Sequence, residues 1–175
     1  KGKIERFEPR ERYIKYIRSF IDPELIRGAK LKVVYDPMHG AGRGYLDKIL
    51  QEMGCKTDAI HAERDVLFGG RKPEPDDENL AELKSKVLEL SADVGLANDG
   101  DADRFGVVDE TGKFLNANQV LSLIFEYLIS EKGYTGAVVR SLATTHFIDR
   151  IADRYKIKVY ETPVGFKYIA ELMMK

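Results

Sequence analysis

Short apolar runs and amphipathic stretches alternate along this chain, and this alternation limits its possible folds more than any other feature. Strand-like runs at residues 31–35, 92–97 and 105–109 are separated by stretches whose apolar residues recur at helical spacing. Chains of this kind bury both types of element by layering helices on a sheet that is mostly parallel. We therefore predict an α/β fold with layered helices on a mixed, largely parallel sheet.

A second run of alternating elements follows the turn at Thr111 and Gly112. It is too short to be a complete domain of the same kind, so we predict a domain over residues 1–113 and an incomplete second α/β unit over residues 114–175. The elements expected in this second unit are helix 116–131, strand 137–139, a helix capped by Thr144 or Thr145, strand 158–160 and helix 165–173.

Residues that cap helices mark several helix starts. Asp22 precedes Pro23, a pair that is typical of the first turn of a helix. Asp77 is predicted to cap the helix that follows a long polar loop over residues 61–76, and a loop of this length is often functional. The residues predicted to face the core are Leu80, Leu83, Val87 and Leu90 in that helix, and Phe147, Ile148 and Ile151 in the second unit.

The composition fits a globular protein without a nucleic-acid or membrane partner. Hydrophobic residues make up 43% of the 175 residues, enough to form a core. The formal net charge of −1 provides no basic surface for nucleic acid or anionic lipid. No apolar run approaches the ~20 residues that a membrane span needs, and no signal peptide is visible in the sequence.

The cysteine content and the two ends of the chain give further expectations. Cys55 is the single cysteine, which excludes an internal disulfide framework and suits a reducing, cytoplasmic location. We expect Cys55 to be a small, partly buried apolar side chain. The chain starts at Lys1 without a methionine and ends at Lys175 directly after an apolar helical run, so we expect it to be a piece of a longer protein.

The hexapeptide 99–104 (Asp-Gly-Asp-Ala-Asp-Arg) carries the clearest chemical signal. Its three aspartates alternate with small residues, so an extended turn would place their carboxylates on one side. Carboxylates held this close repel one another and raise each other's pKa unless a cation lies between them. Mg²⁺ prefers oxygen ligands and often shares carboxylates with a phosphate. The motif therefore predicts that Asp99, Asp101 and Asp103 bind a magnesium ion.

Three other interpretations of this motif are open. Asp and Gly are common in turns, so it could be a solvated acidic turn. In a calcium loop of the helix–loop–helix type, the three aspartates and Glu110 would match the first, third, fifth and twelfth positions, but Arg104 replaces the glycine of position six. A phosphatase of the haloacid dehalogenase type needs Thr or Val two residues after its acid–base aspartate, where Asp103 or Phe105 stands here.

Four segments, in the same order, resemble those of the α-D-phosphohexomutases, the phosphoglucomutase/phosphomannomutase family. They are residues 36–42 (Asp-Pro-Met-His-Gly-Ala-Gly), residues 73–80 with Pro-Glu-Pro and Asn-Leu, the hexapeptide 99–104, and residues 161–167 (Glu-Thr-Pro-Val-Gly-Phe-Lys). The hexapeptide is the specific one, and the others are weak individually. The resemblance implies that the chain comprises domain II and the first part of domain III of a four-domain enzyme, whose domains I and IV lie outside it.

The same resemblance implies a reaction and roles for several residues. A phosphoserine of domain I would exchange a phosphoryl group with the 1- and 6-positions of a hexose phosphate, and the three aspartates would hold Mg²⁺. Arg104 would approach the phosphoryl group, because a guanidinium matches phosphate oxygens. Lys167, in a turn that Gly165 allows, would lie near the phosphate and the reacting hydroxyl. Arg104 could instead pair with one of the aspartates, and Lys167 could be a solvated helix lysine.

Several parts of the family pattern are absent from this sequence. It lacks the catalytic Ser-His-Asn loop, the sugar-recognition loop and the C-terminal phosphate-binding loop, so the chain alone is predicted to be inactive. Residues 165–169 favour the phosphoglucomutase branch. The alternatives are a phosphoglucosamine mutase and a non-catalytic metal-binding α/β domain. We leave open the roles of His39, Arg71, Arg140 and Ser141, and expect a backbone-bonded histidine and a solvated arginine for the first two.

Overall fold

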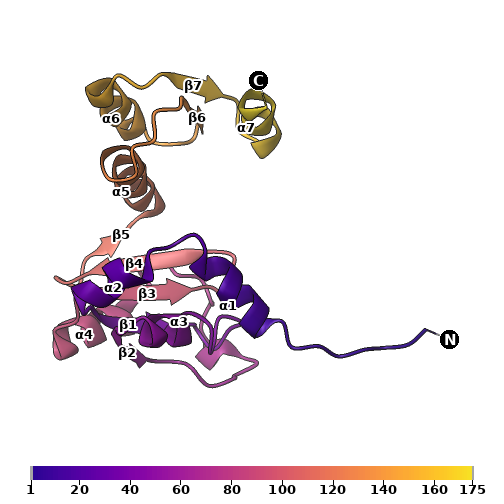
Figure 1. Ribbon diagram of the computed structural model, residues 1–175. Coiled ribbons are helices and arrows are strands. Elements are labelled where there is room, and N and C mark those ends of the chain that lie inside the picture. Colours follow the sequence, from indigo (N-terminus) through magenta and orange to yellow (C-terminus); the bar gives the residue numbers. More distant parts are fainter. Residues whose placement is uncertain (1, 175) are drawn as a thin grey trace. The chain divides into compact units, whose positions relative to one another are not determined.

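Five strands form a mixed sheet in the first of the two units of this protein (Figure 1). The computed structural model describes residues 2–174, which divide into a first unit ending at Leu115 and a second beginning at Asn116. The strands lie in the order β2, β1, β3, β4, β5. Their bounds are Lys32–Asp36 for β1, Lys56–Ala59 for β2, Val94–Asn98 for β3, Phe105–Asp109 for β4 and Phe114–Leu115 for β5.

The strand directions bring three loops to one edge of this sheet. β1 runs parallel to both β2 and β3, so the carboxyl ends of these three strands lie at the same edge. β4 is antiparallel to β3 and β5, and Asn98 pairs with Phe105. The hexapeptide 99–104 therefore connects β3 to β4 at this edge, beside the loops that follow β1 and β2. Ligands of open α/β sheets commonly bind outside the carboxyl ends of the strands.

Helices cover both faces of the sheet. α4 packs against β1, β3 and β4 on one face. Tyr35 of β1 faces the other side, where it lines a groove together with Tyr13 of α1 and Leu46 of α3. A single 3₁₀ turn, η1, lies in the loop after β2. The bounds of these helices are Arg10–Arg18 for α1, Pro23–Ala29 for α2, Leu46–Glu52 for α3, Phe68–Gly70 for η1 and Ala81–Leu90 for α4.

The central strand β1 is buried on both of its faces. Val33, Val34 and Tyr35 are at most 2% exposed, and successive side chains of a strand point to opposite faces. Val34 belongs to the core cluster that includes Leu83 and Val87 of α4. A separate cluster joins α1 and α3 through Ile14, Ile49 and Met53. Burial on both sides explains why residues 33–35 are consecutive apolar residues rather than an alternating pattern.

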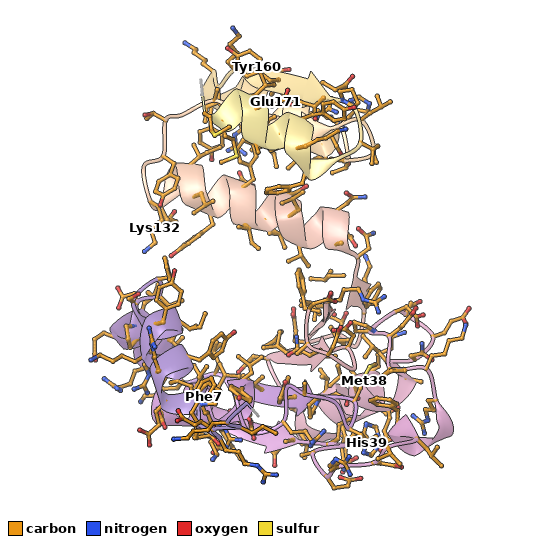
Figure 2. All side chains as sticks on the ribbon, turned by 90° about the vertical axis from the view of Figure 1, so that its right-hand side faces the viewer. Phe7, Met38, His39, Lys132, Tyr160 and Glu171 are labelled. Atoms are coloured by element: carbon orange, nitrogen blue, oxygen red, sulfur yellow. The ribbon has the colours of Figure 1, made fainter. Side chains whose placement is uncertain are left out.

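The second unit contains a two-stranded parallel sheet, in which β6 pairs with β7. The core of this unit includes three buried residues of α6, which are Ile148, Ile151 and Ala152. Figure 2 labels Tyr160 of β7 and Glu171 of α7 in this unit. The bounds of its elements are Ala117–Ser130 for α5, Val138–Ser141 for β6, Phe147–Tyr155 for α6, Val159–Thr162 for β7 and Phe166–Met173 for α7.

The predicted α/β class with a mixed sheet is confirmed, and so is one of the two predicted Asp caps. Asp22 Oδ1 accepts the N–H groups of Glu24 and Leu25 at the start of α2. The cap at Asp77 is wrong, because α4 begins only at Ala81. Before the helix starts, the Asp76 side chain accepts the Asn79 N–H at 2.9 Å and so forms a turn. The Asp77 side chain pairs with Lys84 and caps no helix.

Two of the seven side chains that were predicted to face the core are exposed. Leu90 is 38% exposed and Phe147 is 52% exposed, so the prediction is wrong for both. Leu90 is the last residue of α4 and Phe147 the first residue of α6, where the chain enters or leaves the helix and the apolar face no longer lies against the core. The five buried residues, for which the prediction is confirmed, are Leu80, Leu83, Val87, Ile148 and Ile151.

Two whole-chain expectations can be compared with the structure. Across residues 2–174, no helix combines the length and the apolar composition that a membrane crossing requires. Cys55 is a free thiol and is 6% exposed, so it is more deeply buried than the partly buried apolar side chain that was expected. Burial raises the pKa of this thiol.

Candidate metal and phosphate site

Residues 99–104, which we call the acidic turn, form a tight connection between β3 and β4. The Ala102 N–H donates to Asp99 O at 3.1 Å, and the Asp99 N–H donates to Arg104 O at 3.3 Å. Ala102 has a φ of +64°, in the left-handed region that residues with a side chain rarely adopt. Because strands rather than helices flank this turn, a calcium site of the helix–loop–helix type is excluded.

The carboxylates of the acidic turn converge on one point. One oxygen from each of Asp99, Asp101 and Asp103 lies within 4.8 Å of the other two. Asp99 is 1% exposed, whereas the other two are exposed. In an octahedral Mg²⁺ site, adjacent ligand oxygens are about 3.0 Å apart and opposite ones about 4.2 Å apart. Small rotations of the two exposed side chains would reach this geometry, so the donor set fits a hard divalent cation.

The pKa values in the acidic turn reflect repulsion between its charges. The Asp101 carboxylate raises the pKa of Asp103, with smaller contributions from burial and from Asp99. For Asp99, burial acts to raise the pKa, but hydrogen bonds from the backbone and side chain of Arg104 outweigh it, and the pKa is lowered. The turn therefore holds a buried, ionised carboxylate beside two exposed ones that repel each other, an arrangement that a divalent cation would neutralise.

Arg104 closes the acidic turn through Asp99. Its backbone N–H donates to Asp99 Oδ1 and its Nε donates to Oδ2, each at 2.9 Å. The side chain is 58% exposed, and Nη1 lies 3.6 Å from Glu74 Oε1, which is longer than a hydrogen bond. The ion pair that was considered as an alternative role is thus present, but it uses the Nε edge of the guanidinium. Each Asp99 oxygen keeps a further lone pair for a cation.

Gly100, between two of the aspartates, is held by a loop on either side. Its N–H donates to Pro73 O at 3.1 Å, and its carbonyl accepts the Ala41 N–H at 2.9 Å. A Cβ atom on Gly40 would lie 2.6 Å from Gly100 O, so only glycine allows the two backbones to approach this closely. The turn after β1 (residues 37–42) and the loop after β2 (residues 61–76) therefore both fix the position of the acidic turn.

A groove of about 380 Å³ runs beside Asp101, between the acidic turn and aromatic side chains of the first unit. Tyr35 is fully buried at its base, and its hydroxyl lies 2.9 Å from Asn98 Oδ1 and 3.1 Å from Gly42 O. Asn98 Nδ2 in turn donates to Arg104 O at 3.0 Å. The Tyr35 hydroxyl therefore supports the acidic turn through Asn98.

Gly165 and Lys167 lie in the second unit, at the start of α7. Gly165 has a φ of +140°, which favours glycine. Lys167 is exposed, and its Nζ lies 4.8 Å from the centre of the Tyr168 ring, a cation–π distance. The acidic turn and Arg104 are thus brought together within the first unit, while Gly165 and Lys167 form a separate group within the second.

Two of the residues whose roles were left open have the environments that were expected. His39 Nδ1 lies 3.2 Å from the backbone oxygen of Glu63. Arg71 is exposed, and its guanidinium lies 3.5 Å from Glu82 Oε2. What sequence reasoning missed is that His39 also contacts the ring of His61 in a small cavity. No local pattern marks this contact, because the two histidines follow different strands.

Arg140, one of the other two residues whose roles were left open, is a buried arginine with two carboxylate partners, and Ser141 follows it in β6. Arg140 is 6% exposed; its Nε and Nη2 donate to the two Asp149 oxygens at 2.6 Å, and its Nη1 lies 2.8 Å from Glu161 Oε2. The Ser141 and Thr144 hydroxyls are 3.1 Å apart. Arg140 therefore joins β6, α6 and β7 within the second unit, a role that its partners, distant in sequence, did not reveal.

Two family models match this chain. The one described as "Phosphoglucomutase/phosphomannomutase, alpha/beta/alpha domain II" matches residues 11–112, and the one for domain III of the same family matches residues 116–175. A crystal structure of a candidate phosphomannomutase from Thermus thermophilus is similar, with a TM-score of 0.89 and 34% identity. That match covers 99% of this chain and 40% of the other.

The curated proteins that are similar to this chain have the names of different phosphomutases. A phosphoglucomutase/phosphomannomutase from Thermococcus kodakarensis is 36% identical over 99% of this chain and 38% of that protein. A phosphopentomutase from the same organism is 39% identical over 87% of this chain and 33% of that protein. A candidate phosphoglucosamine mutase from Methanosarcina acetivorans is 37% identical over 84% of this chain and 33% of that protein. The chain therefore spans less than two fifths of the length of these relatives.

Proposed function

Because this chain belongs to the phosphoglucomutase/phosphomannomutase family, we propose that it is part of a magnesium-dependent phosphohexomutase. In the proposed reaction a phosphoryl group moves reversibly between the 1- and 6-positions of a hexose phosphate, through a phosphoserine outside this chain. The observation that carries the proposal is the acidic turn. There, three carboxylates converge within 4.8 Å beside an arginine, at the carboxyl edge of the parallel strands.

In this proposal Asp99, Asp101 and Asp103 hold Mg²⁺, which when bound would neutralise charge on the oxygens of the transferring phosphoryl group. The buried Asp99 carboxylate also orders the turn by accepting two bonds from Arg104, which leaves the two exposed carboxylates free to rotate toward the cation. Arg104 presents a guanidinium that is 58% exposed from the same turn, where it could bind phosphate oxygens.

The proposal extends to the second unit and to the parts of the protein outside this chain. Lys167 would bind the substrate phosphate and stabilise charge or transfer a proton, and Gly165 would provide the backbone turn that presents it. The domain that carries the metal turn would comprise residues 1–113, and residues 114–175 would form the N-terminal part of domain III. Domains I and IV of the same polypeptide would contribute the phosphoserine and further substrate contacts.

The identity of the sugar is a separate question. The names of the relatives include a phosphoglucosamine mutase and a phosphopentomutase, so phosphoglucosamine mutase is the second candidate function. We expect the full-length protein to act on glucose 1-phosphate more efficiently than on the mannose, glucosamine or pentose phosphates. The ratio of kcat/KM values for these four substrates tests this expectation. A ratio that favours glucosamine phosphate would replace it with the second candidate.

Calorimetric titration of the 175-residue chain separates the catalytic cation site from a structural one. The mutase proposal expects weak Mg²⁺ binding, because the phosphoserine ligand lies outside the chain. A non-catalytic structural site would instead bind Ca²⁺ tightly, and chelation would lower the melting temperature substantially. Tight Ca²⁺ binding with such a fall would contradict the mutase proposal.

Activity measurements test whether catalysis needs both this chain and the parts of the protein outside it. The 175-residue chain with glucose 1-phosphate and Mg²⁺ is expected to show no turnover, because no phosphoserine is available. In the full-length protein, Asp101→Ala is expected to abolish activity and leave the melting temperature close to that of the unaltered protein. Turnover by the chain alone, or an active Asp101→Ala variant, would be incompatible with the proposal.

A further inference from the structure

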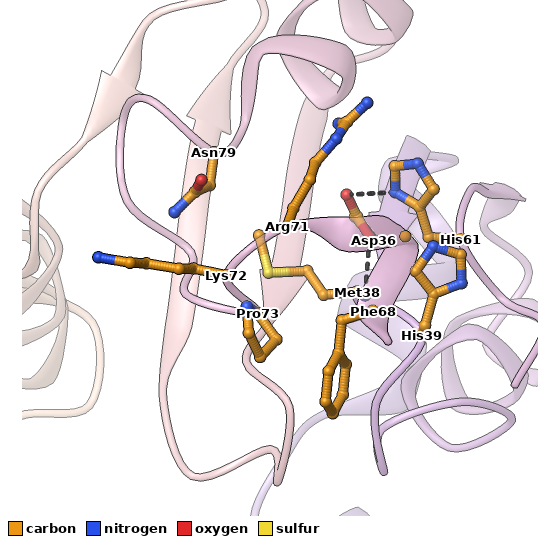
Figure 3. Close-up of a pocket in the computed structure, with 10 residues that line it drawn as sticks. Asp36, Met38, His39, His61, Phe68, Arg71, Lys72, Pro73 and Asn79 are labelled. Carbon is orange, nitrogen blue, oxygen red and sulfur yellow. Dashed lines mark hydrogen bonds and ion pairs between the residues drawn. The ribbon is translucent and has the colours of Figure 1, made fainter. Parts of the chain in front are cut away.

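A small cavity of about 60 Å³ lies next to the acidic turn, lined by the 37–42 turn and the 61–76 loop (Figure 3). His39 and His61 line one side of it, and Phe68 and Pro73 line another. Met38 lies beside His39, as Figure 2 also shows. None of these side chains belongs to the three carboxylates that are proposed to hold the cation.

The backbone around this cavity is unusually rich in left-handed conformations. Eight non-glycine residues of the described chain have a positive φ, and three of them end helices. Of the other five, Met38, His39, His61 and Phe68 line the cavity, and Ala102 lies in the acidic turn. This conformation is unfavourable for residues with a side chain, and it persists where surrounding contacts enforce it, often at functional sites.

The contacts that enforce this backbone centre on Asp36, which is 2% exposed at the end of β1. Its Oδ1 accepts the Met38 N–H at 2.7 Å, and its Oδ2 accepts a hydrogen bond from His61 Nδ1 at 3.0 Å (Figure 3). The His39 N–H donates to His61 O at 2.9 Å, and the two imidazole rings lie 4.9 Å apart. These contacts tie the 37–42 turn to the start of the 61–76 loop.

The same two segments hold Gly100 in the acidic turn. On one side, a Cβ atom on Gly100 would lie 3.1 Å from Pro73 Cγ and 3.3 Å from Phe68 Cε1. On the other side, the Gly40 backbone packs directly on the Gly100 carbonyl. Because both contacts are close, a change in the spacing of the two segments must displace Gly100. Its neighbours Asp99 and Asp101 would then move as well.

We propose that Asp36, His39 and His61 form a brace that positions the acidic turn for cation binding. The brace fixes the spacing of the two segments that hold Gly100, and thereby the distance between the carboxylates on either side of it. These are positioning residues, because they act through the backbone of the turn. The inference rests on the metal site proposed above and adds residues outside the turn to it. Partners of this indirect kind commonly change metal affinity by 10- to 100-fold when altered.

The test is the affinity of the 175-residue chain for Mn²⁺, followed by the electron paramagnetic resonance signal of the free ion. His61→Leu removes the hydrogen bond to Asp36 and is expected to weaken Mn²⁺ binding about tenfold. His61→Asn places an amide N–H close to the position of Nδ1 and is expected to restore most of the affinity. If His61→Leu does not melt cooperatively, Asp36→Asn weakens the same hydrogen bond with little change in shape and is expected to lower the affinity likewise.

The control is Ile49→Val, which perturbs the separate core cluster of α1 and α3 and is expected to leave Mn²⁺ affinity unchanged. A folded His61→Leu or Asp36→Asn variant with unaltered affinity would refute the brace, as would equal losses of affinity in His61→Leu and His61→Asn.

Asp101→Asn tests the metal site itself. If the unaltered chain and Asp101→Asn bound Mn²⁺ equally, the metal site would be refuted and the brace with it. If Asp101→Asn lost Mn²⁺ binding while His61→Leu and Asp36→Asn kept it, the brace would be refuted and the metal site would stand.

Discussion

At the scale of single residues, Asp101 combines a proposed ligand role with a destabilising charge. Its carboxylate raises the pKa of Asp103, so the two repel each other in the metal-free chain. We predict that Asp101→Asn abolishes Mn²⁺ binding and slightly raises the melting temperature measured in EDTA. Asp58→Asn makes the same change at an exposed position of β2 and should leave Mn²⁺ binding intact. A fall in the metal-free melting temperature of Asp101→Asn would contradict this account.

Tyr35 provides a second residue-scale test, because a single oxygen atom connects it to the acidic turn. Its hydroxyl contacts Asn98 and Gly42, and burial raises its pKa. Tyr35→Phe removes the single hydroxyl hydrogen that lies within reach of both acceptors and is predicted to lower the free energy of unfolding by about 1 kcal/mol. Tyr45→Phe, in the same groove, is the matched control and should change it by less than about 0.5 kcal/mol. Urea unfolding followed by circular dichroism measures both, and equal effects would refute the role of the Tyr35 hydroxyl.

The residues of the acidic turn could be identified from sequence because their pattern is local. Three aspartates within five positions need only one turn to converge, and a turn between two apolar runs was predictable. His61 could not be identified in this way. It becomes important only because β1 and β2 are adjacent and parallel, which places Asp36 and His61 together across 25 positions of sequence. Arg140 was left open for the same reason, since its carboxylate partners come from two other elements.

At the scale of elements, the packing of α4 on the sheet can be tested at one glycine. Gly95 of β3 faces α4, and a Cβ atom there would lie 2.7 Å from Val87 Cγ2 and 3.1 Å from Leu83 Cγ. Gly95→Ala is therefore predicted to lower the free energy of unfolding by about 1–3 kcal/mol. The same change at Gly28, within α2 and with no atom near its Cβ position, should raise it by about 0.5–1 kcal/mol. Denaturant titration of both variants would show opposite signs; a shared sign would contradict this packing.

The presence of a helix could be predicted from the spacing of its apolar residues. The residue at which a helix starts depends on side-chain hydrogen bonds that this spacing does not reveal. Asp22 caps α2 because Pro23 follows it and fixes the first helical turn. Asp77 looked equivalent, yet Asp76 and Asn79 form a turn that delays α4 to Ala81. A capping residue therefore identifies a helix start only where no neighbouring polar side chain competes for the same N–H groups.

At the scale of the whole molecule, the described residues divide into two compact units. The first unit ends after Leu115, because β5 turns back to pair with β4 and so extends the first sheet. Asn116 then opens α5 with a capping box, in which its side chain accepts the Gln119 N–H. Our prediction of a division after residue 113 rested on a strand–turn–strand signal that is followed at once by a helix start. The burial of Arg140 in the second unit, beside the apolar residues Ile148 and Ile151, could not be predicted in this way.

That buried arginine makes the second unit sensitive to acid. Hydrogen bonds from Arg140, followed by the contact with His146, lower the pKa of Asp149 to about 2. Since folding lowers this pKa, Asp149 contributes its full stabilisation above about pH 4, and the contribution is lost as the pH falls toward about 2. We predict that hydrogen exchange of the β6 and β7 amides, corrected for intrinsic rates, becomes faster over this interval.

Asp149→Asn tests whether this carboxylate causes the acid response. The amide keeps the shape of the side chain but cannot ionise, so the variant should be less stable near neutral pH because Arg140 loses one of its two charged partners and keeps only Glu161. Its second unit should also respond less to acid between about pH 4 and pH 2. Asp153→Asn makes the same change at an exposed position of α6 and should keep the response of the unaltered chain. If Asp149→Asn and the unaltered chain responded equally, the acid sensitivity would have to arise from carboxylates outside the Arg140 network.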